Sequence, residues 1–208
     1  MQDDPQDGQQ SEDGSPRGQR TRQTIYEEAM RLFETKGFRG TSMRDIAAAC
    51  GVTKPALYYH FECKSQLLAK LYEDITAKFF EDVREIAAAQ DSAESNLRRL
   101  VVSQSIYNIN NRRFLQIFWN ERHELEGEAR DALARLEREF EATVQSLMER
   151  GQAEGAFAEA PPKVVTYAVL GLLSTVHRWA LYTDRPPEVV AEHIADLVLG
   201  GVIRRGDA

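Results

Sequence analysis

The sequence predicts an all-α protein, with an N-terminal three-helix domain that contains a helix-turn-helix and a larger C-terminal helical domain. Three observations predict this fold class. Apolar residues recur at helical spacing over most of the chain, strand-like alternation is absent from it, and Gly and Pro separate the helical segments. With 208 residues, of which 42% are hydrophobic and 28% charged, the chain is long enough to bury a substantial core.

The first 18 residues predict a disordered acidic tail. Residues 1–16 contain five Asp or Glu and no Lys or Arg, and no aliphatic or aromatic residue follows Met1. Such a composition cannot bury enough apolar surface to become ordered. We expect the tail to be a solubilising extension. The alternative is that it folds back onto a basic surface of the chain.

A first helical domain is predicted over residues 19–65, and its first helix runs from about Gln19 to Lys36 before Gly37 and Gly40 end it. The stretch after it, TSMRDIAAACGVTKPALYYHF, predicts two short helices joined by a tight turn. Ser42 and Asp45 have the spacing of a capping box at the first of them, and Gly51 can take the positive φ that ends it. Two residues suit the start of the second short helix: Thr53 as its cap and Pro55 in its first turn.

The second short helix carries an outward face that a protein core does not explain. Leu57 and Phe61 face inward, which leaves small, cationic and hydroxyl-bearing residues outside: Lys54, Ala56, Tyr58, Tyr59 and His60. A helix in a DNA major groove needs such residues, because they bond to base edges and phosphates and let the backbone approach. We therefore expect double-stranded DNA as a partner. The alternative is a buried helical hairpin with a few exposed aromatic residues.

The same stretch resembles a known family. Its segments T-S-M-R-D-I-A, G-V-T, A-L-Y-Y-H-F and K-S-Q-L-L, in a gapless match from about Ile25 to Leu71, are similar to the N-terminal signature of the TetR family of bacterial transcriptional regulators. We expect one group of residues to face bases: Thr53, Lys54, Pro55, Ala56 and Tyr58. A second group is expected to hold phosphates: Thr41, Ser42, Tyr59, His60 and Lys64. Arg44 resembles a base-contacting position of the family and is expected to pair with guanine.

The charge distribution agrees with a DNA-binding N-terminal domain. The net charge is −7, but residues 17–64 have nine Lys or Arg and five Asp or Glu, a balance of +4. Residues 65–208 have 17 bases and 23 acids. Positive charge is therefore concentrated in the segment that resembles a DNA reader. Three residues near its start either contact DNA or are simply solvated, and both alternatives stay open: Arg17, Arg20 and Arg22.

The second domain, residues 66–208, predicts a series of helices at about 64–89, 93–110, 112–125, 127–149, 163–182 and 187–203. The last two are apolar on nearly all sides and must be buried by something. Their apolar residues are Val165, Val169, Leu172, Leu173, Val176, Val190, Ile194, Leu197, Val198 and Val202, with Gly171, Gly200 and Gly201 permitting close approach. We expect a homodimer through these helices, which is also how the resembled family dimerises. A dimer places two recognition helices roughly 34–36 Å apart, so that they read a palindromic operator.

Aromatic and polar residues between these helices predict a site for a hydrophobic small-molecule effector. We expect the following residues to bind it: Tyr107, Phe114, Phe118, Trp119, Glu121, His123, His177, Arg178 and Trp179. The segments FLQIFWNERHEL and HRWALY are similar to the effector domain of members that respond to fatty acids and acyl-CoA. The resemblance thus implies a repressor that a fatty acyl-CoA releases from its operator. The alternative for these aromatic residues is an ordinary core.

The sequence offers weaker signals for several other functions. His123 with Glu121 or Glu124, and with His177, offers metal ligands without a strong zinc spacing, so we expect neither a metal nor a cofactor. No arrangement of nucleophile, base and orienting group predicts an enzyme. A constitutive DNA-binding protein and a helical small-molecule enzyme or carrier stay as alternatives. The free pair Cys50 and Cys63, and the lack of a signal peptide or long apolar run, predict a cytoplasmic protein without a membrane partner.

Overall fold

The computed structural model describes residues 16–203, and of Pro16 and Arg17 it describes the backbone alone. The all-α prediction is confirmed, since helices make up nearly all of the regular structure in this range. The described chain divides into two compact units between Leu67 and Leu68. Helix α1 begins at Pro16, three residues before the predicted start, while residues 1–15 of the predicted tail lie outside the described range.

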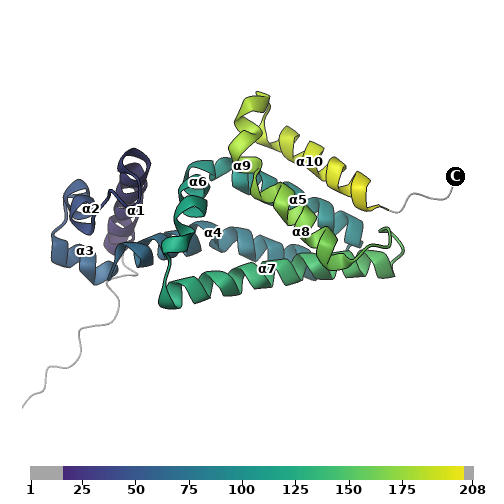
Figure 1. Cartoon of the computed structure of the whole chain (residues 1–208), viewed down its shortest axis with the longest axis horizontal. Coiled ribbons are helices and arrows are strands. Elements are labelled where there is room, and N and C mark those ends of the chain that lie inside the picture. The colour runs from purple at the N-terminus through teal and green to yellow at the C-terminus, as the bar shows by residue number, and fades with distance from the viewer. Residues whose placement is uncertain (1–15, 204–208) are drawn as a thin grey trace, which may run out of the picture. The chain divides into compact units, whose positions relative to one another are not determined.

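The first unit contains α1 (Pro16–Lys36), α2 (Met43–Cys50), α3 (Lys54–His60) and the start of α4 (Lys64–Ala88), as Figure 1 shows. Helix α1 packs against α2, and α2 against α3. Aromatic rings join the elements: the Tyr26 and Phe61 rings lie 5.9 Å apart, and those of Phe33 and Phe38 lie 5.1 Å apart. The core of the unit also contains buried aliphatic side chains: Ile25, Ala29, Leu32, Ile46 and Leu57.

The local signals around the turn are confirmed. The Asp45 amide donates to the Ser42 hydroxyl over 3.2 Å, and the Ser42 amide donates to the Asp45 carboxylate over 2.9 Å, which completes the capping box of α2. Gly51 has a φ of +67°, so a side chain there would be strained. Thr53 caps α3 by accepting from the Ala56 amide over 3.3 Å. Short-range hydrogen bonds thus fix the start of α3.

The second unit is built from the rest of α4 and the helices that follow it. These are α5 (Ala93–Asn110), α6 (Arg112–Glu121), the 3₁₀ turn η1 (Arg122–Glu124), α7 (Gly127–Ala153), α8 (Pro162–Ser174), α9 (Val176–Trp179), η2 (Ala180–Thr183) and α10 (Pro187–Val202). Helix α5 contacts α7, α8, α9 and α10, and Figure 1 shows α10 and α7 on opposite sides of it. A buried α5 therefore organises this unit.

The structure corrects two predicted helices. The helix predicted over 112–125 ends at Glu121, and the one predicted over 163–182 is interrupted after Ser174. Near this interruption, the Ser174 and Thr175 hydroxyls donate to carbonyls three residues back, over 2.8 and 3.1 Å. The side-chain amide of Asn108, on α5, donates to the Leu173 carbonyl over 2.9 Å. These side chains thus donate hydrogen bonds to carbonyl groups that would accept from backbone N–H groups in a continuous helix.

The segment Pro162–Thr183 is the one candidate membrane span found in the described range, by length and composition only. An 18-residue window of this 22-residue segment has a mean hydropathy of 1.3, and 33% of that window is buried. In the structure it is divided among α8, α9 and η2, and both α8 and α9 contact α5. A helix that packs on one side in a globular bundle has a similar composition, and the contacts of α8 and α9 with α5 agree with that role.

Candidate functional site

Helix α3 presents its polar face to solvent. Leu57 is fully buried and Phe61 is 1% exposed, whereas the exposed fractions of Tyr58 and Tyr59 are 40% and 72%. Thr53, Lys54, Pro55 and Ala56 are exposed as well. The Lys54 ammonium lies 5.5 Å from the centre of the Tyr58 ring, a cation–π distance that orients both side chains. The residues expected to face bases therefore share one accessible surface.

Two of the other predicted DNA contacts lie on or beside α2. Ser42 and Arg44 are both exposed. The hydrogen bonds from Ser42 lower the pKa of the Asp45 carboxyl, so the carboxylate that completes the capping box stays charged at neutral pH. Tyr59 is exposed next to the half-buried His60, and their rings meet edge to face at 5.3 Å. The loop before α2 and the end of α3 thus also offer hydrogen-bonding groups to a ligand.

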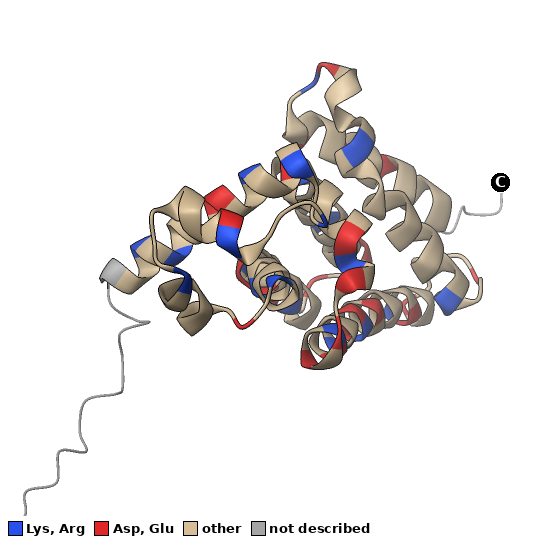
Figure 2. Cartoon of the chain, turned by 60° about the vertical axis from the view of Figure 1, so that its left-hand side comes forward, with Lys and Arg blue, Asp and Glu red and all other residues tan. Residues whose placement is uncertain are grey.

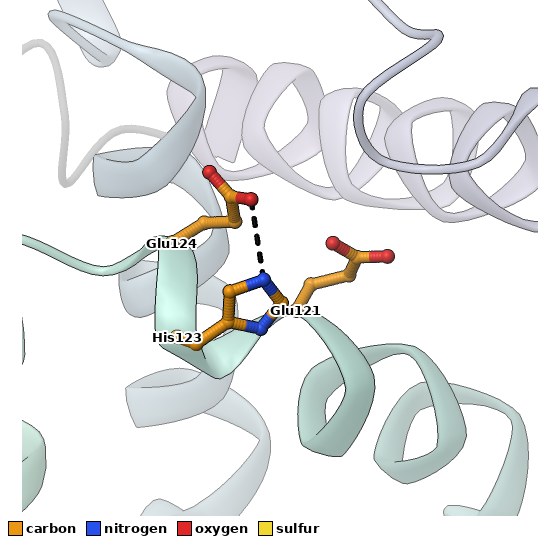
Figure 3. Close-up of side chains that lie close together, drawn as sticks. All are labelled: Glu121, His123 and Glu124. Carbon is orange, nitrogen blue, oxygen red and sulfur yellow. Dashed lines mark ion pairs between the residues drawn. The ribbon is translucent and has the colours of Figure 1, made fainter.

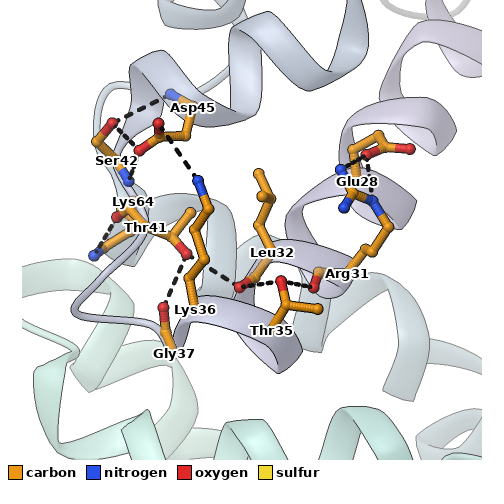
Figure 4. A network of polar contacts seen from close by, with 10 residues as sticks. All are labelled: Glu28, Arg31, Leu32, Thr35, Lys36, Gly37, Thr41, Ser42, Asp45 and Lys64. Atoms are coloured by element: carbon orange, nitrogen blue, oxygen red, sulfur yellow. Dashed lines mark hydrogen bonds and ion pairs between the residues drawn. The ribbon is translucent and has the colours of Figure 1, made fainter.

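Thr41 and Lys64 differ from the rest, because their polar groups bond to the backbone (Figure 4). Thr41 is 2% exposed, and its hydroxyl lies 2.8 Å from the Gly37 carbonyl and 3.3 Å from that of Leu32. The Lys64 ammonium donates to the carbonyls of Phe38 and Thr41, the second over 2.7 Å. It also lies 4.2 Å from the centre of the Phe38 ring. Both residues therefore hold the connection between α1 and α2.

Charge is distributed differently in the two units (Figure 2). Over residues 18–67 of the first unit, eight Lys or Arg stand against five Asp or Glu, whereas acidic and basic residues alternate along α7 of the second unit. Arg20 is exposed on α1 and Arg22 is half-buried, while the Arg17 side chain lies outside the described atoms. The excess of positive charge on the unit that presents α3 suits a polyanionic partner.

The second unit contains a cavity of about 430 Å³ between α4, α5, α6, α7 and α8, which is partly open to solvent. Its wall is dominated by aromatic rings: Tyr72, Phe79, Phe80, Tyr107, Trp119, Phe140 and Tyr167. The Phe79 ring stacks on Tyr107 at 4.8 Å and meets Phe140 edge to face at 5.5 Å. Such a cavity has the size and character of a small-molecule site.

Two of the predicted ligand residues, Tyr107 and Trp119, line this cavity. Phe114 and Phe118 are buried and pack on Tyr72, with the Phe118 ring stacked on it at 4.0 Å. The other predicted residues are not part of the cavity wall: Glu121, His123, His177, Arg178 and Trp179. Of these, His177 is 4% exposed, and burial lowers its pKa. Trp179 is 37% exposed on the surface.

Sequence reasoning did not assign the cavity residues of α4 and α7. On α4 they are Tyr72, Thr76, Phe79 and Phe80, and on α7 they are Glu137, Phe140 and Glu141. A signal was present in α4, because positions 72, 76, 79 and 80 follow the helical period beside the main apolar stripe. A second apolar face on the same helix indicates that it is covered on two sides.

The polar groups of the cavity wall are partly paired. Both Glu137 oxygens accept from the Arg122 guanidinium, at 2.7 and 2.8 Å. The Tyr167 hydroxyl donates to Glu141 over 2.5 Å. Gln104 Oε1 and the Tyr107 hydroxyl are buried without a hydrogen-bond partner among the described residues. Burial also raises the pKa of Tyr107 well above its usual value, so its hydroxyl keeps its proton.

The sequence of η1 and the residue before it bring three donor groups together (Figure 3). Ligand atoms of Glu121, His123 and Glu124 lie within 4.8 Å of one another, and His123 Nε2 is 3.3 Å from a Glu124 oxygen. His177 is not part of this group. This short segment offers three possible metal ligands, whereas a structural zinc site has four protein ligands.

Comparison with known proteins places this geometry in a family. Residues 25–71 match the profile described as "Bacterial regulatory proteins, tetR family", and residues 90–202 match "Tetracyclin repressor-like, C-terminal domain". The repressor KstR2 of Rhodococcus jostii is 28% identical over 141 residues, which cover 67% of this chain and 68% of KstR2.

Solved structures agree with both profiles. A TetR/AcrR-family regulator from Thermobifida fusca is 31% identical, with a TM-score of 0.70 over 86% of this chain and 97% of its own. AibR, crystallised with isovaleryl coenzyme A and operator DNA, is 26% identical, with a TM-score of 0.72 over 86% of this chain and 96% of its own. With a family profile over more than half of its length, the chain belongs to the TetR family of bacterial transcriptional regulators.

Proposed function

We propose that this regulator binds a palindromic operator as a homodimer in the cytoplasm, acts as a repressor, and leaves the operator when a hydrophobic small molecule fills its cavity. The observation that supports the proposal is the combination of two features in one chain. The first unit exposes the polar face of α3, and the second unit contains an aromatic cavity. A regulator that a small molecule controls needs two sites, one that binds DNA and one that binds the small molecule.

In the DNA complex, α3 lies in the major groove and its exposed face meets the bases. Thr53, Lys54 and Tyr58 supply hydrogen bonds, while Pro55 and Ala56 allow close approach. Arg44 pairs with a guanine edge, and a further group bonds to phosphates: Ser42, Tyr59 and His60. Thr41 and Lys64, also expected at phosphates, already bond to backbone carbonyls. We propose that these two residues position the loop before α2.

A second copy of the chain covers the apolar surface of α8 and α10. Val164 is 63% exposed on α8, and Leu197 is 66% exposed on α10. A groove of about 330 Å³ runs between these helices and the end of α7, with an almost wholly apolar lining. Two exposed glycines of α10, Gly200 and Gly201, have no atom within 4 Å of the place where a Cβ would lie, whereas Gly171 lines the aromatic cavity. Such a surface suits the close helix approach of a symmetric interface.

The effector acts through α4. This helix begins at Lys64 in the first unit and carries Tyr72, Thr76, Phe79 and Phe80 of the cavity wall in the second. A ligand that binds one position of α4 better than another shifts the population of the DNA-binding state. AibR was crystallised with isovaleryl coenzyme A, and we propose an acyl-CoA as the first effector to test, with its acyl chain in the cavity.

A fluorescence-anisotropy titration tests this proposal. The duplex is first selected from a random library with the purified full chain, and the titration is repeated at several salt concentrations. We expect salt-dependent binding of two chains per duplex, and a loss of affinity when dodecanoyl-CoA is added. Binding that no hydrophobic ligand changes would support a constitutive DNA-binding protein. The absence of duplex binding would support a carrier or an enzyme.

Substitution of Arg44 or Lys54 by Ala is expected to weaken operator binding by roughly 1–3 kcal/mol and to relax the preference at one base pair, because each loses a base contact. Competition with duplexes that carry single substitutions measures both effects. Lys78→Ala is the control, because Lys78 lies on α4 in the second unit and pairs with Glu81 and Asp82. Equal losses on all duplexes for Arg44→Ala would reject its role as a base reader.

A further inference from the structure

The cavity of the second unit has an unequal balance of charge. Its wall includes the carboxylates of Glu137 and Glu141, and none of its lining residues is Lys, Arg or His. Two cations lie over aromatic rings of this wall: the Arg122 guanidinium is 4.9 Å from the centre of the Trp119 ring, and the Lys163 ammonium is 5.9 Å from the centre of the Tyr167 ring. Both Glu137 oxygens already bond to this guanidinium. Arg122 therefore offsets Glu137 and leaves the charge of Glu141.

Glu141 has one neutral partner. The Tyr167 hydroxyl donates to it over 2.5 Å, and in the described part of the chain no Lys or Arg forms an ion pair with it. Its side chain is half-buried on the cavity wall, and the Tyr167 ring beside it is 50% exposed, so the pair lies where the cavity opens to solvent. A carboxylate in such a place gains more from a cation than a fully solvated one does, because water screens the pair less. The same carboxylate repels an anionic ligand.

The unpaired polar atoms of the wall favour the same kind of ligand. Gln104 lines the cavity and is 9% exposed, and its Oε1 is buried without a partner among the residues described. A buried acceptor without a hydrogen bond is costly, and a ligand that carries an N–H or O–H removes this cost. An ionised carboxylate has no hydrogen to donate and cannot do so. Aromatic rings such as Phe79 and Phe140 add attraction for a cation.

We infer that this cavity ranks the head groups of otherwise identical amphiphiles by charge, and that Glu141 sets the order. It binds a primary ammonium most tightly, an alcohol less tightly and a carboxylate least. The inference rests on the proposed function only in that it concerns the same cavity. An acyl-CoA is compatible with this ranking if only its uncharged acyl chain lies in the cavity and its phosphates remain outside.

Isothermal titration calorimetry of the full chain, without DNA, tests the ranking. The probes are dodecylammonium, dodecanol and dodecanoate at pH 7.5, which share one chain and differ in the head group. We expect the Kd of dodecylammonium to be at least about tenfold below that of dodecanoate, with dodecanol between them. Equal affinities, the reverse order, or no binding of any probe would overturn the inference.

A pair of variants on α7 tests the role of Glu141. Glu141→Gln is expected to reduce the preference for the ammonium over the alcohol to about one, since the amide has no charge. Glu139→Gln is the matched control, because Glu139 lies outside the cavity wall, has a 54% exposed side chain and pairs with Arg84. An unchanged preference in Glu141→Gln would overturn the assignment to this residue. The wild-type ranking tests the inference even if that variant misfolds.

Release of the operator is measured separately by anisotropy with the same three probes. A ranked series of affinities without any release would leave the inference intact and count against the proposed function. Release by dodecanoate alone would overturn the inference and support the proposed function. Calorimetry therefore tests the head-group ranking, and anisotropy tests the proposed function, so that each can be contradicted without the other.

Discussion

Replacing Phe118 by Ala is expected to lower the free energy of unfolding by roughly 3–5 kcal/mol, because it removes a whole aromatic side chain from a packed core. Phe118 is fully buried, its ring stacks on Tyr72 at 4.0 Å, and the Phe114 ring lies 5.7 Å away. Urea denaturation followed by circular dichroism measures the change.

Two further variants make this test specific. Tyr182→Ala removes a ring that is 84% exposed and is expected to change the stability by less than about 0.5 kcal/mol. Phe118→Leu keeps most of the apolar volume and is expected to retain both the fold and the binding of cavity ligands. If Phe118→Leu were as stable as the wild type but bound no ligand, Phe118 would be a direct ligand contact and not a support behind the cavity.

The DNA-binding unit was the more predictable part of the chain, because short-range signals determine it. Ser42, Asp45 and Gly51 act on backbone groups within about four residues, so their spacing in the sequence is enough to place the ends of α2. The alternation of buried Leu57 with exposed Tyr58 and Tyr59 follows from the helical period in the same way. The DNA contacts themselves stay predictions.

The cavity was less predictable, because residues from five helices form it. Phe114 and Phe118 have the same composition and spacing as pocket residues, yet they pack behind the wall on Tyr72. Glu141 belongs to a face of α7 that is rich in charged residues, a pattern typical of a solvated helix face, yet it lines the cavity because α7 packs beside α4 there. The interruption after Ser174 depends on Asn108, 65 residues away from the Leu173 carbonyl that it binds. Contacts between residues so far apart in the sequence produce no local sequence pattern, so the sequence alone does not predict them.

Replacing Lys64 by Met is expected to destabilise the first unit by roughly 1.5–3 kcal/mol, because it leaves two carbonyls without their charged donor. The Lys64 ammonium bonds to the carbonyls of Phe38 and Thr41, which stand 26 and 23 residues before it. The loop before α2 would then lose its fixed position, and every operator sequence should be bound more weakly. Thermal unfolding and anisotropy measure the two effects.

The salt dependence of binding separates the two roles of Lys64. Removal of a phosphate contact lowers the slope of log K against log salt by roughly one, whereas removal of a positioning residue from a folded protein leaves the slope unchanged. We expect an unchanged slope, because the ammonium already donates to two carbonyls. Lys70→Met is the control, since Lys70 pairs with Glu73 and Asp74 on the same helix. If the slope falls by one in Lys64→Met while the stability is unchanged, Lys64 is a phosphate contact. The hydrogen bonds of Thr41 would then hold the loop before α2 without Lys64.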